Sequence, residues 1–112
     1  ECTFNSGGVG VTAEVALATV ATADTVPAAW LANAALFGES ASRIVVSAPA
    51  GKLDAVLAAA ADAGVPAAVI GKTGGDRVRL SVAGNVVVDS AIAEAEQSWA
   101  TCIERRMSGH VR

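Results

Sequence analysis

The chain is poor in aromatic residues and in the side chains that most often perform catalysis. Its 112 residues include two Phe, two Trp, no Tyr, one His and two Cys. With so few large rings, a deep aromatic-lined pocket is not expected. The single histidine, His110, lies in the last residues, so no Ser–His or Cys–His arrangement is expected. Cys2 and Cys102 lie far apart without a CxxC pair, which argues against a zinc site. Two reduced thiols are expected, and a disulfide between them is the alternative.

Strong charge of one sign and long hydrophobic runs are also missing. Eight Lys and Arg against eleven Asp and Glu give a formal net charge of −3. The cations are dispersed and form no basic stripe, so nucleic acid is not expected as a partner. No apolar run approaches the roughly 20 residues of a membrane span, and no signal-peptide pattern is present. We therefore expect no membrane partner and a cytoplasmic location.

Small hydrophobic residues, mainly Ala and Val, make up much of the chain. Hydrophobic residues account for 53% of the sequence, and its length suits one domain with a real core. We predict a single domain over residues 1–107 and a flexible tail over residues 108–112. The first residue is Glu1 rather than Met and a glycine-rich turn follows at once, which is typical of a fragment of a longer polypeptide.

Hydrophobic periodicity predicts strands that alternate with helices. The expected strands are residues 9–17, 43–48, 67–70, 77–82 and 86–88, the last two forming a hairpin. The expected helices are residues 27–38, 52–63 and 89–107, the last capped by Asp89 or Ser90. This order predicts an α+β fold with a mixed sheet covered by helices, ferredoxin-like in arrangement. A small open parallel α/β sheet is the alternative.

Two glycine-rich segments superficially suggest phosphate loops. Gly7 and Gly8 open a GGxG run, but the spacing is not GxGxxG and a strand follows instead of a helix. A turn is expected there, and close backbone approach to a ligand or a partner domain is the alternative. Residues 71–75 are likewise expected to be a connecting turn, in which Lys72 could be a surface cation near an anion.

A short cluster of acidic, hydroxyl and basic side chains follows the first predicted helix. It comprises Glu39, Ser40, Ser42 and Arg43. Serine hydroxyls can donate to phosphate oxygens and arginine binds them bidentately. Glu39 could accept from a sugar hydroxyl or hold a Mg²⁺-bound water. The cluster is a candidate ligand-facing loop, and a solvated loop with a local Glu–Arg pair is the alternative.

Several motifs, taken in order, resemble a known enzyme family. They are Leu36-Phe37-Gly38-Glu39-Ser40, Ser42-Arg43 before a Val-rich strand, Gly64-Val65-Pro66 after an Ala-rich helix, and Ile70-Gly71 with Gly74-Gly75. This order resembles the last domain of the synthetase subunit (subunit II) of phosphoribosylformylglycinamidine synthase. The Gly7-Gly8 run resembles the entry to that domain, and the helix ending near Met107 resembles the end of the subunit.

The resemblance implies a ligase of purine biosynthesis. Such enzymes make formylglycinamidine ribonucleotide from formylglycinamide ribonucleotide, ATP and glutamine-derived ammonia, with Mg²⁺. It also implies α/β/α layers, partly ferredoxin-like, as in the C-terminal domain of aminoimidazole ribonucleotide synthetase. The family's catalytic His and its ATP and Mg²⁺ ligands lie in upstream halves. We therefore expect no catalytic or metal-binding residue here, no bound cofactor, and no activity of the isolated chain.

The resemblance further implies partners and binding residues. The partners would be the upstream domains of the same subunit, a separate glutaminase subunit and a small accessory subunit. In the family's first C-terminal-type half, a Glu-Ser-Gln run helps to bind substrate, but here Ala41 replaces the amide. Substrate or auxiliary-site binding, rather than catalysis, is thus implied. The residues expected to bind are Glu39, Ser40, Arg43, Gly7 and Gly8.

Two other classes of function stay open on the sequence. One is a free-standing ferredoxin-like module that binds a small ligand or regulates another protein. The other is a purely structural oligomerisation domain, which predicts no ligand at the Glu39–Arg43 cluster. An exposed apolar face that drives self-association is expected if the chain is a fragment.

Overall fold

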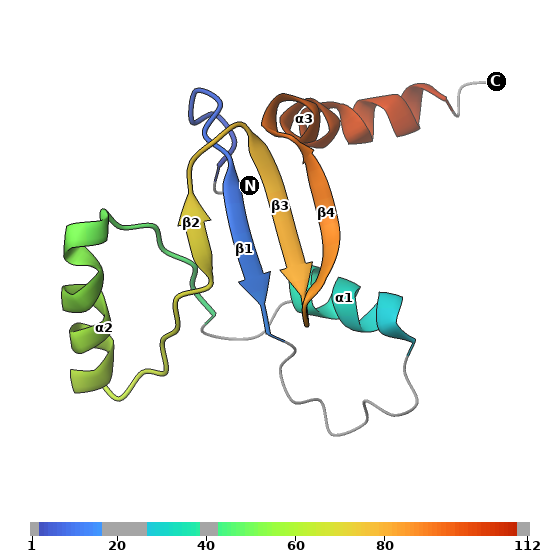
Figure 1. Cartoon of the computed structure of the whole chain (residues 1–112). Helices are drawn as coiled ribbons and strands as arrows, with labels where there is room; N and C mark the ends of the chain where they lie inside the picture. The colour runs from blue at the N-terminus through green and yellow to red at the C-terminus, as the bar shows by residue number, and fades with distance from the viewer. Residues whose placement is uncertain (1–2, 17–26, 39–42, 110–112) are drawn as a thin grey trace.

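The computed structural model of the chain describes residues 3–16, 27–38 and 43–109 (Figure 1). Within them, the strands are β1 (Val11–Val15), β2 (Gly71–Thr73), β3 (Arg77–Val82) and β4 (Asn85–Ala91). The helices are α1 (Ala28–Phe37), α2 (Leu53–Asp62) and α3 (Ile92–Ser108), with a short 3₁₀ turn, η2 (Ala50–Lys52), leading into α2. All three predicted helices are confirmed, as is the strand near the start.

The four strands form one mixed sheet in the order β2-β1-β3-β4. β1 pairs antiparallel with β2 and parallel with β3, whereas β3 and β4 pair antiparallel. The mixed α+β class predicted from the sequence is therefore confirmed. The element order differs from the ferredoxin-like βαββαβ pattern, because both α1 and α2 lie between β1 and β2 along the chain.

The β3–β4 hairpin follows from its turn residues. Ala83 and Gly84 both have positive φ, 49° and 79°, as a type I′ turn requires at its two central positions. Antiparallel pairing runs from Val82 opposite Asn85 to Arg77 opposite Ala91, with one irregularity between Leu80 and Ser81. The predicted hairpin is confirmed.

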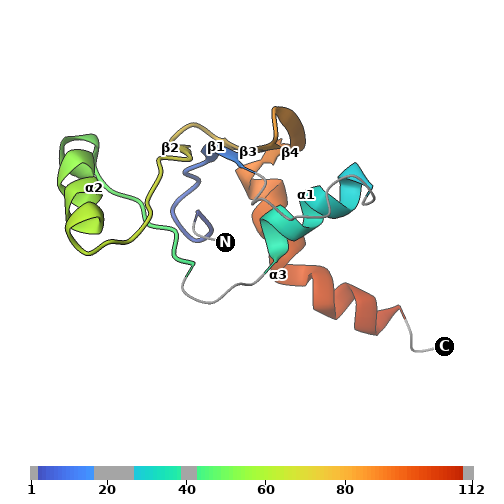
Figure 2. The same ribbon diagram turned by 90° about the horizontal axis from the view of Figure 1, so that it is seen from below.

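Alternation along the strands gives the sheet an apolar and a polar face. Ala13, Val78 and Val82 are buried, as is Ile92 at the start of α3. Figure 2 shows α1, α3 and the N-terminal segment on one side of the sheet; among the described residues, no helix lies over the other side. The predicted layering of helices is thus present on one face, while the polar face lies open. Antiparallel and mixed sheets commonly leave one face to solvent.

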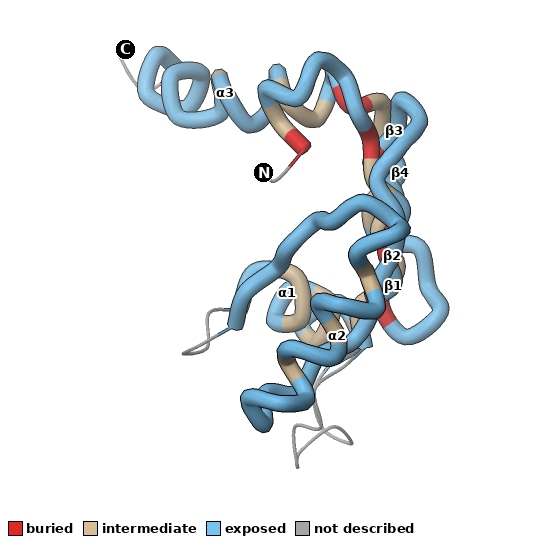
Figure 3. The backbone as a smooth tube through the Cα atoms, turned by 90° about the vertical axis from the view of Figure 1, so that its left-hand side faces the viewer, coloured by how far each residue is buried: buried red, intermediate tan, exposed pale blue. Residues whose placement is uncertain are grey.

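The core is small for a chain of this length. Only a few positions in the described residues are buried, in the N-terminal segment, along the central strands and at the start of α3 (Figure 3). The accessible surface is 8889 Å², against about 5,700 Å² for a compact protein of this mass. The radius of gyration is 16.6 Å, against about 13 Å for a compact domain. Much apolar surface is therefore left uncovered within this chain.

The predicted strands at residues 43–48 and 67–70 are wrong. Both segments run extended beside α2, and every residue in them is exposed. Figure 1 shows them connecting α2, which stands beyond the β2 edge, to the rest of the molecule. β-Branched residues such as Ile44, Val45 and Val46 suit a strand, but a strand also needs a neighbour to pair with. In the described part of the chain, residues 43–48 and 67–70 form no strand; Ile70, just before β2, accepts a hydrogen bond from the Glu14 N–H of β1 at 2.7 Å.

Two local predictions were also wrong. Residues 71–73 form β2 instead of part of a turn, because Lys72 pairs with Thr12 of β1. Asp89 and Ser90 do not cap α3, since β4 runs straight into the helix and its N-cap residue is Ala91, without a side-chain cap. By contrast, Gly64 ends α2 as predicted, with φ of 68° and its N–H bonded to the Ala61 carbonyl.

Candidate functional site

The predicted ligand loop lies mostly outside the described residues. Glu39, Ser40 and Ser42 lie outside the described residues. Arg43 is the first residue after them and is exposed at the start of the extended segment before α2. Its guanidinium is therefore open to solvent.

The glycine turn at Gly7 and Gly8 precedes β1, as the sequence predicted. Both glycines have positive φ, 79° and 90°, where a side chain would strain the backbone. The Ser6 hydroxyl holds the turn, because it accepts a hydrogen bond from the Val9 N–H at 3.1 Å and donates to the Thr3 carbonyl. The turn is exposed and presents bare backbone to its surroundings.

The predicted binding residues do not form one cluster among the described residues. Figure 1 shows the glycine turn at the top end of β1, whereas the segment that begins at Arg43 starts below the sheet. A single small ligand would not touch both places in this arrangement. The binding roles of Gly7, Gly8 and Arg43 stay predictions.

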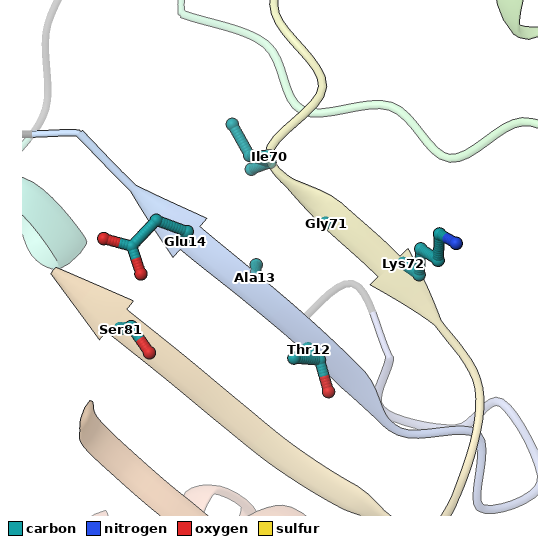
Figure 4. A pocket seen from close by; sticks show the side chains of 7 residues that line it. All are labelled: Thr12, Ala13, Glu14, Ile70, Gly71, Lys72 and Ser81. Carbon is teal, nitrogen blue, oxygen red and sulfur yellow. The ribbon is translucent and has the colours of Figure 1, made fainter. Parts of the chain in front are cut away.

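The open face of the sheet carries a different group of polar side chains. A shallow groove of about 340 Å³ runs over β1 and its neighbours (Figure 4). The residues that line it are Thr12, Ala13, Glu14, Ile70, Gly71, Lys72 and Ser81. Gly71 allows the two strands to approach, since a Cβ at this position would overlap the Thr12 carbonyl oxygen and lie 2.6 Å from Ala13 Cα.

Strand register sets one polar row across this face. Thr12 of β1 lies opposite Lys72 of β2 on one side and opposite Arg79 of β3 on the other. Directly opposite residues point to the same face of a sheet. Arg79 in turn lies opposite Asp89 of β4. The row therefore reads cation, hydroxyl, cation, carboxylate across four strands.

Both carboxylates near this row are engaged by other groups. Asp89 accepts from the Arg77 Nε at 2.8 Å in an exposed ion pair, and the hydrogen bond and charge of Asp89 raise the pKa of Arg77 above its usual value. Glu14 accepts a hydrogen bond from the Gly84 N–H at 2.7 Å, at the β3–β4 turn. The carboxylate opposite Arg79, that of Asp89, is therefore already paired with Arg77.

A second hollow lies on α3. Ser98, Cys102, Arg105 and Arg106 line about 430 Å³ of open space along the helix. Cys102 is exposed with a free thiol, and its Sγ donates to the Trp99 carbonyl at 3.3 Å. All four residues come from a single helix, so the hollow is a stretch of helix surface without walls from other elements.

The part of the chain that the structure describes shows neither a metal-ligand cluster nor a membrane-spanning helix. No group of three or more His, Cys, Asp or Glu side chains there is placed to hold a metal ion. None of the helices in residues 27–38 and 43–109 is long and apolar enough to cross a bilayer. His110 and Cys2 lie outside the described residues.

Comparison with known families identifies the domain type. Residues 4–83, from the N-terminal segment to the β3–β4 turn, match the family described as "AIR synthase related protein, C-terminal domain". The chain belongs to this family. The match covers most of the chain and supports the resemblance that the motifs suggested. It leaves β4 and α3 outside the family model.

Several curated relatives are named as subunits of phosphoribosylformylglycinamidine synthase. A "Phosphoribosylformylglycinamidine synthase subunit PurL" of Sinorhizobium fredii (strain NBRC 101917 / NGR234) is 42% identical over 101 residues, covering 85% of this chain and 13% of the relative. The PurL subunit of Thermomicrobium roseum is 45% identical over 67 residues, which cover 60% of this chain and 9% of the relative. The PurL subunit of Corynebacterium ammoniagenes is 38% identical over 76 residues, which cover 68% of this chain and 9% of the relative. The resemblance drawn from the motifs is confirmed.

The chain spans only 13%, 9% and 9% of the length of these three relatives. No solved structure gives a significant match to it. What the relatives do as whole proteins is therefore a matter for proposal.

The polar row was only partly visible in the sequence. Lys72 was expected to be a surface cation near an anion, whereas Thr12 and Arg79 lie within the predicted strands at residues 9–17 and 77–82. That these three lie side by side depends on β1 pairing with both β2 and β3. No sequence signal specifies that pairing, because β1 and β3 are far apart along the chain.

Proposed function

We propose that this chain acts as the C-terminal domain of a phosphoribosylformylglycinamidine synthase subunit. The observation that carries the proposal is the 42% identity to a PurL subunit over 85% of the chain. The proposed parent is an ATP-dependent carbon–nitrogen ligase of purine biosynthesis. It makes formylglycinamidine ribonucleotide from formylglycinamide ribonucleotide and glutamine-derived ammonia in the cytoplasm.

In this proposal the chain supplies structure and no catalytic residue. ATP and Mg²⁺ serve the parent enzyme and are held by its upstream halves, so the isolated chain binds neither and is inactive.

The proposed partners follow from the same assignment. They are the upstream domains of the subunit, a separate glutaminase subunit and a small accessory subunit. The large uncovered apolar surface supports packing against further domains. Trp30 and Phe37 of α1 are 70% and 74% exposed, and Ile44 is 81% exposed. A group of large apolar side chains exposed to this extent usually marks a surface that packs against another domain or protein.

Binding at an auxiliary site is proposed for the residues that the sequence singled out. Glu39, Ser40 and Arg43 would contact the ligand, and the exposed backbone at Gly7 and Gly8 would approach a ligand or a neighbouring domain. The exposure of Arg43 and the bare glycine backbone are compatible with these roles.

Activity measured in trans tests the proposal. The parent subunit without this domain is mixed with the glutaminase and accessory subunits, and synthesis of formylglycinamidine ribonucleotide is followed with and without the 112-residue chain. We expect no turnover by the chain alone and restored turnover on mixing. A V82D chain, whose buried charge disrupts the core, serves as the control and should restore nothing.

Two results would contradict the proposal. ATP-dependent turnover by the purified chain would place catalysis within it. Equal activity of the parent subunit with and without the chain would show that this domain is dispensable, and would favour a free-standing ligand-binding module.

A further inference from the structure

The open face of the sheet concentrates positive charge in an acidic protein. The chain has a formal net charge of −3, yet Lys72, Arg77 and Arg79 all lie on the strands of this face. Lys72 and Arg79 flank Thr12 directly, one on each neighbouring strand. Neighbouring strands are about 4.8 Å apart, so the Cα atoms of the two cations are separated by about 10 Å.

The carboxylates of this face do not neutralise these two cations. Asp89, which lies opposite Arg79, is held by Arg77 at 2.8 Å. Glu14 is turned to the end of the strand, where it accepts from the Gly84 N–H. Among the described residues, no ion pair to Lys72 or Arg79 is found. The row thus offers two exposed cations with a hydroxyl donor between them.

We propose that the row Lys72–Thr12–Arg79 binds the dianion of a phosphate monoester. A guanidinium presents a planar fork that matches phosphate oxygens, an ammonium adds a compact charge, and the Thr12 hydroxyl donates a hydrogen bond. The adjacent groove accommodates the organic part of the ligand, with Ser81 and Ile70 among the residues that line it. The site involves residues other than those of the proposed auxiliary site, and all of them belong to this chain.

Binding requires one side chain to move. Figure 4 shows the Lys72 ammonium directed away from β1, whereas Thr12 lies within the groove. An exposed lysine changes rotamer within nanoseconds, so its turn toward Thr12 is fast and costs little. The backbone of the three strands is already paired and needs no change.

Titration followed by NMR amide shifts tests the site on the whole 112-residue chain. Ribose 5-phosphate, inorganic phosphate and neutral ribose are added separately at constant ionic strength. We expect saturable shifts centred on residues 12, 72 and 79 with both phosphates, and none with ribose. K72Q and R79Q should each weaken binding about fivefold, as is usual for loss of one exposed charge contact. T12V keeps the β-branched shape and should weaken binding by a smaller factor.

The control removes a cation elsewhere. R105Q alters the hollow on α3 and should leave the affinity unchanged, although it lowers the net charge by the same amount as R79Q. Wild-type affinity in both K72Q and R79Q would overturn the proposal, as would equal weakening by R105Q, which indicates charge screening alone. Shifts with ribose of the same size would show that the phosphate is not recognised. None of these outcomes depends on activity of the parent enzyme, so failure here leaves the proposed function standing.

Discussion

The ring of Phe4 lies against the ring of Trp99, with centroids 5.3 Å apart and planes inclined by 45°. The contact joins the N-terminal segment to the middle of α3. One residue further on, the Asn5 N–H donates to the Glu96 carboxylate at 3.2 Å, across 91 positions of sequence. These contacts attach the segment before β1 to the C-terminal helix and cover part of the apolar sheet face.

Removal of the Phe4 ring should loosen α3 from the sheet. We expect F4A to lower the free energy of unfolding by about 2 kcal/mol, from the lost aromatic pair and the lost burial. Urea unfolding followed by tryptophan fluorescence measures the change. The control is F37A, which deletes a ring that is 74% exposed and should cost under about 0.5 kcal/mol. Equal effects of the two would contradict a structural role for the pair.

A second prediction concerns the small core. Val82 is 4% exposed, and V82A should cost about 2 kcal/mol because two methyl groups leave a packed site. Val65 is 56% exposed, and V65A makes the same chemical change at the surface with little effect on stability. Thermal unfolding of both variants by circular dichroism provides the comparison. A larger loss in V65A would show that the residues after α2 are packed in solution.

The third prediction tests the close approach of strands at Gly10. A Cβ there would lie 2.6 Å from the Arg77 nitrogen, closer than real contacts allow. G10A should therefore destabilise the β1–β3 pairing by about 1–3 kcal/mol. At Gly51 an added Cβ meets no atom within 4 Å, so G51A should leave stability unchanged or raise it slightly. Hydrogen exchange of the β1 and β3 amides would report which pairing is lost.

The ion pair between Arg77 and Asp89 gives a prediction about pH. The raised pKa of Arg77 means that its stabilising charge is fully present below its ordinary pKa and is lost only as pH rises through the higher folded value. The difference in stability between the wild type and R77Q should therefore be constant from about pH 7 to about pH 10. It should shrink as salt is added, because the pair is exposed. A difference that disappears within this pH range would assign the effect to another group.

Exposed apolar segments should drive the isolated chain to self-associate. Light scattering should give an average mass that rises above the monomer as concentration increases. I44K places a charge in the exposed, unpaired run at residues 44–46 and should reduce association. A59K adds the same charge on the exposed surface of α2 and should reduce it less. A monomer of constant mass at high concentration would contradict the expectation.

Local patterns predicted the elements whose partners are near in sequence. The hairpin is set by Ala83 and Gly84, and α2 is set by its periodicity and by Gly64 at its end. The segment at residues 43–48 has an equally strong strand pattern, yet it is unpaired. Composition shows that a segment is suited to a strand. Whether it pairs depends on a second strand, which the local pattern does not identify.

The candidate sites differ in the same way. Glu39, Ser40 and Arg43 were found because acid, hydroxyl and cation are adjacent in the sequence. Lys72 was identified only as a surface cation and Arg79 only as part of a predicted strand, since nothing in the sequence indicates which strand lies between them. The structure places Thr12 there.

By itself, the sequence determined the family, the mixed α+β class, the three helices and the two faces of each paired strand. Those properties depend on composition, motif order and periods of two and 3.6 residues, all of which are local. Only the tertiary structure decided that β1 lies between β2 and β3, that β2 begins at Gly71, and that the polar face stays uncovered. These features depend on contacts between segments that are distant in the chain. The relative free energies of such contacts cannot be predicted from local sequence patterns.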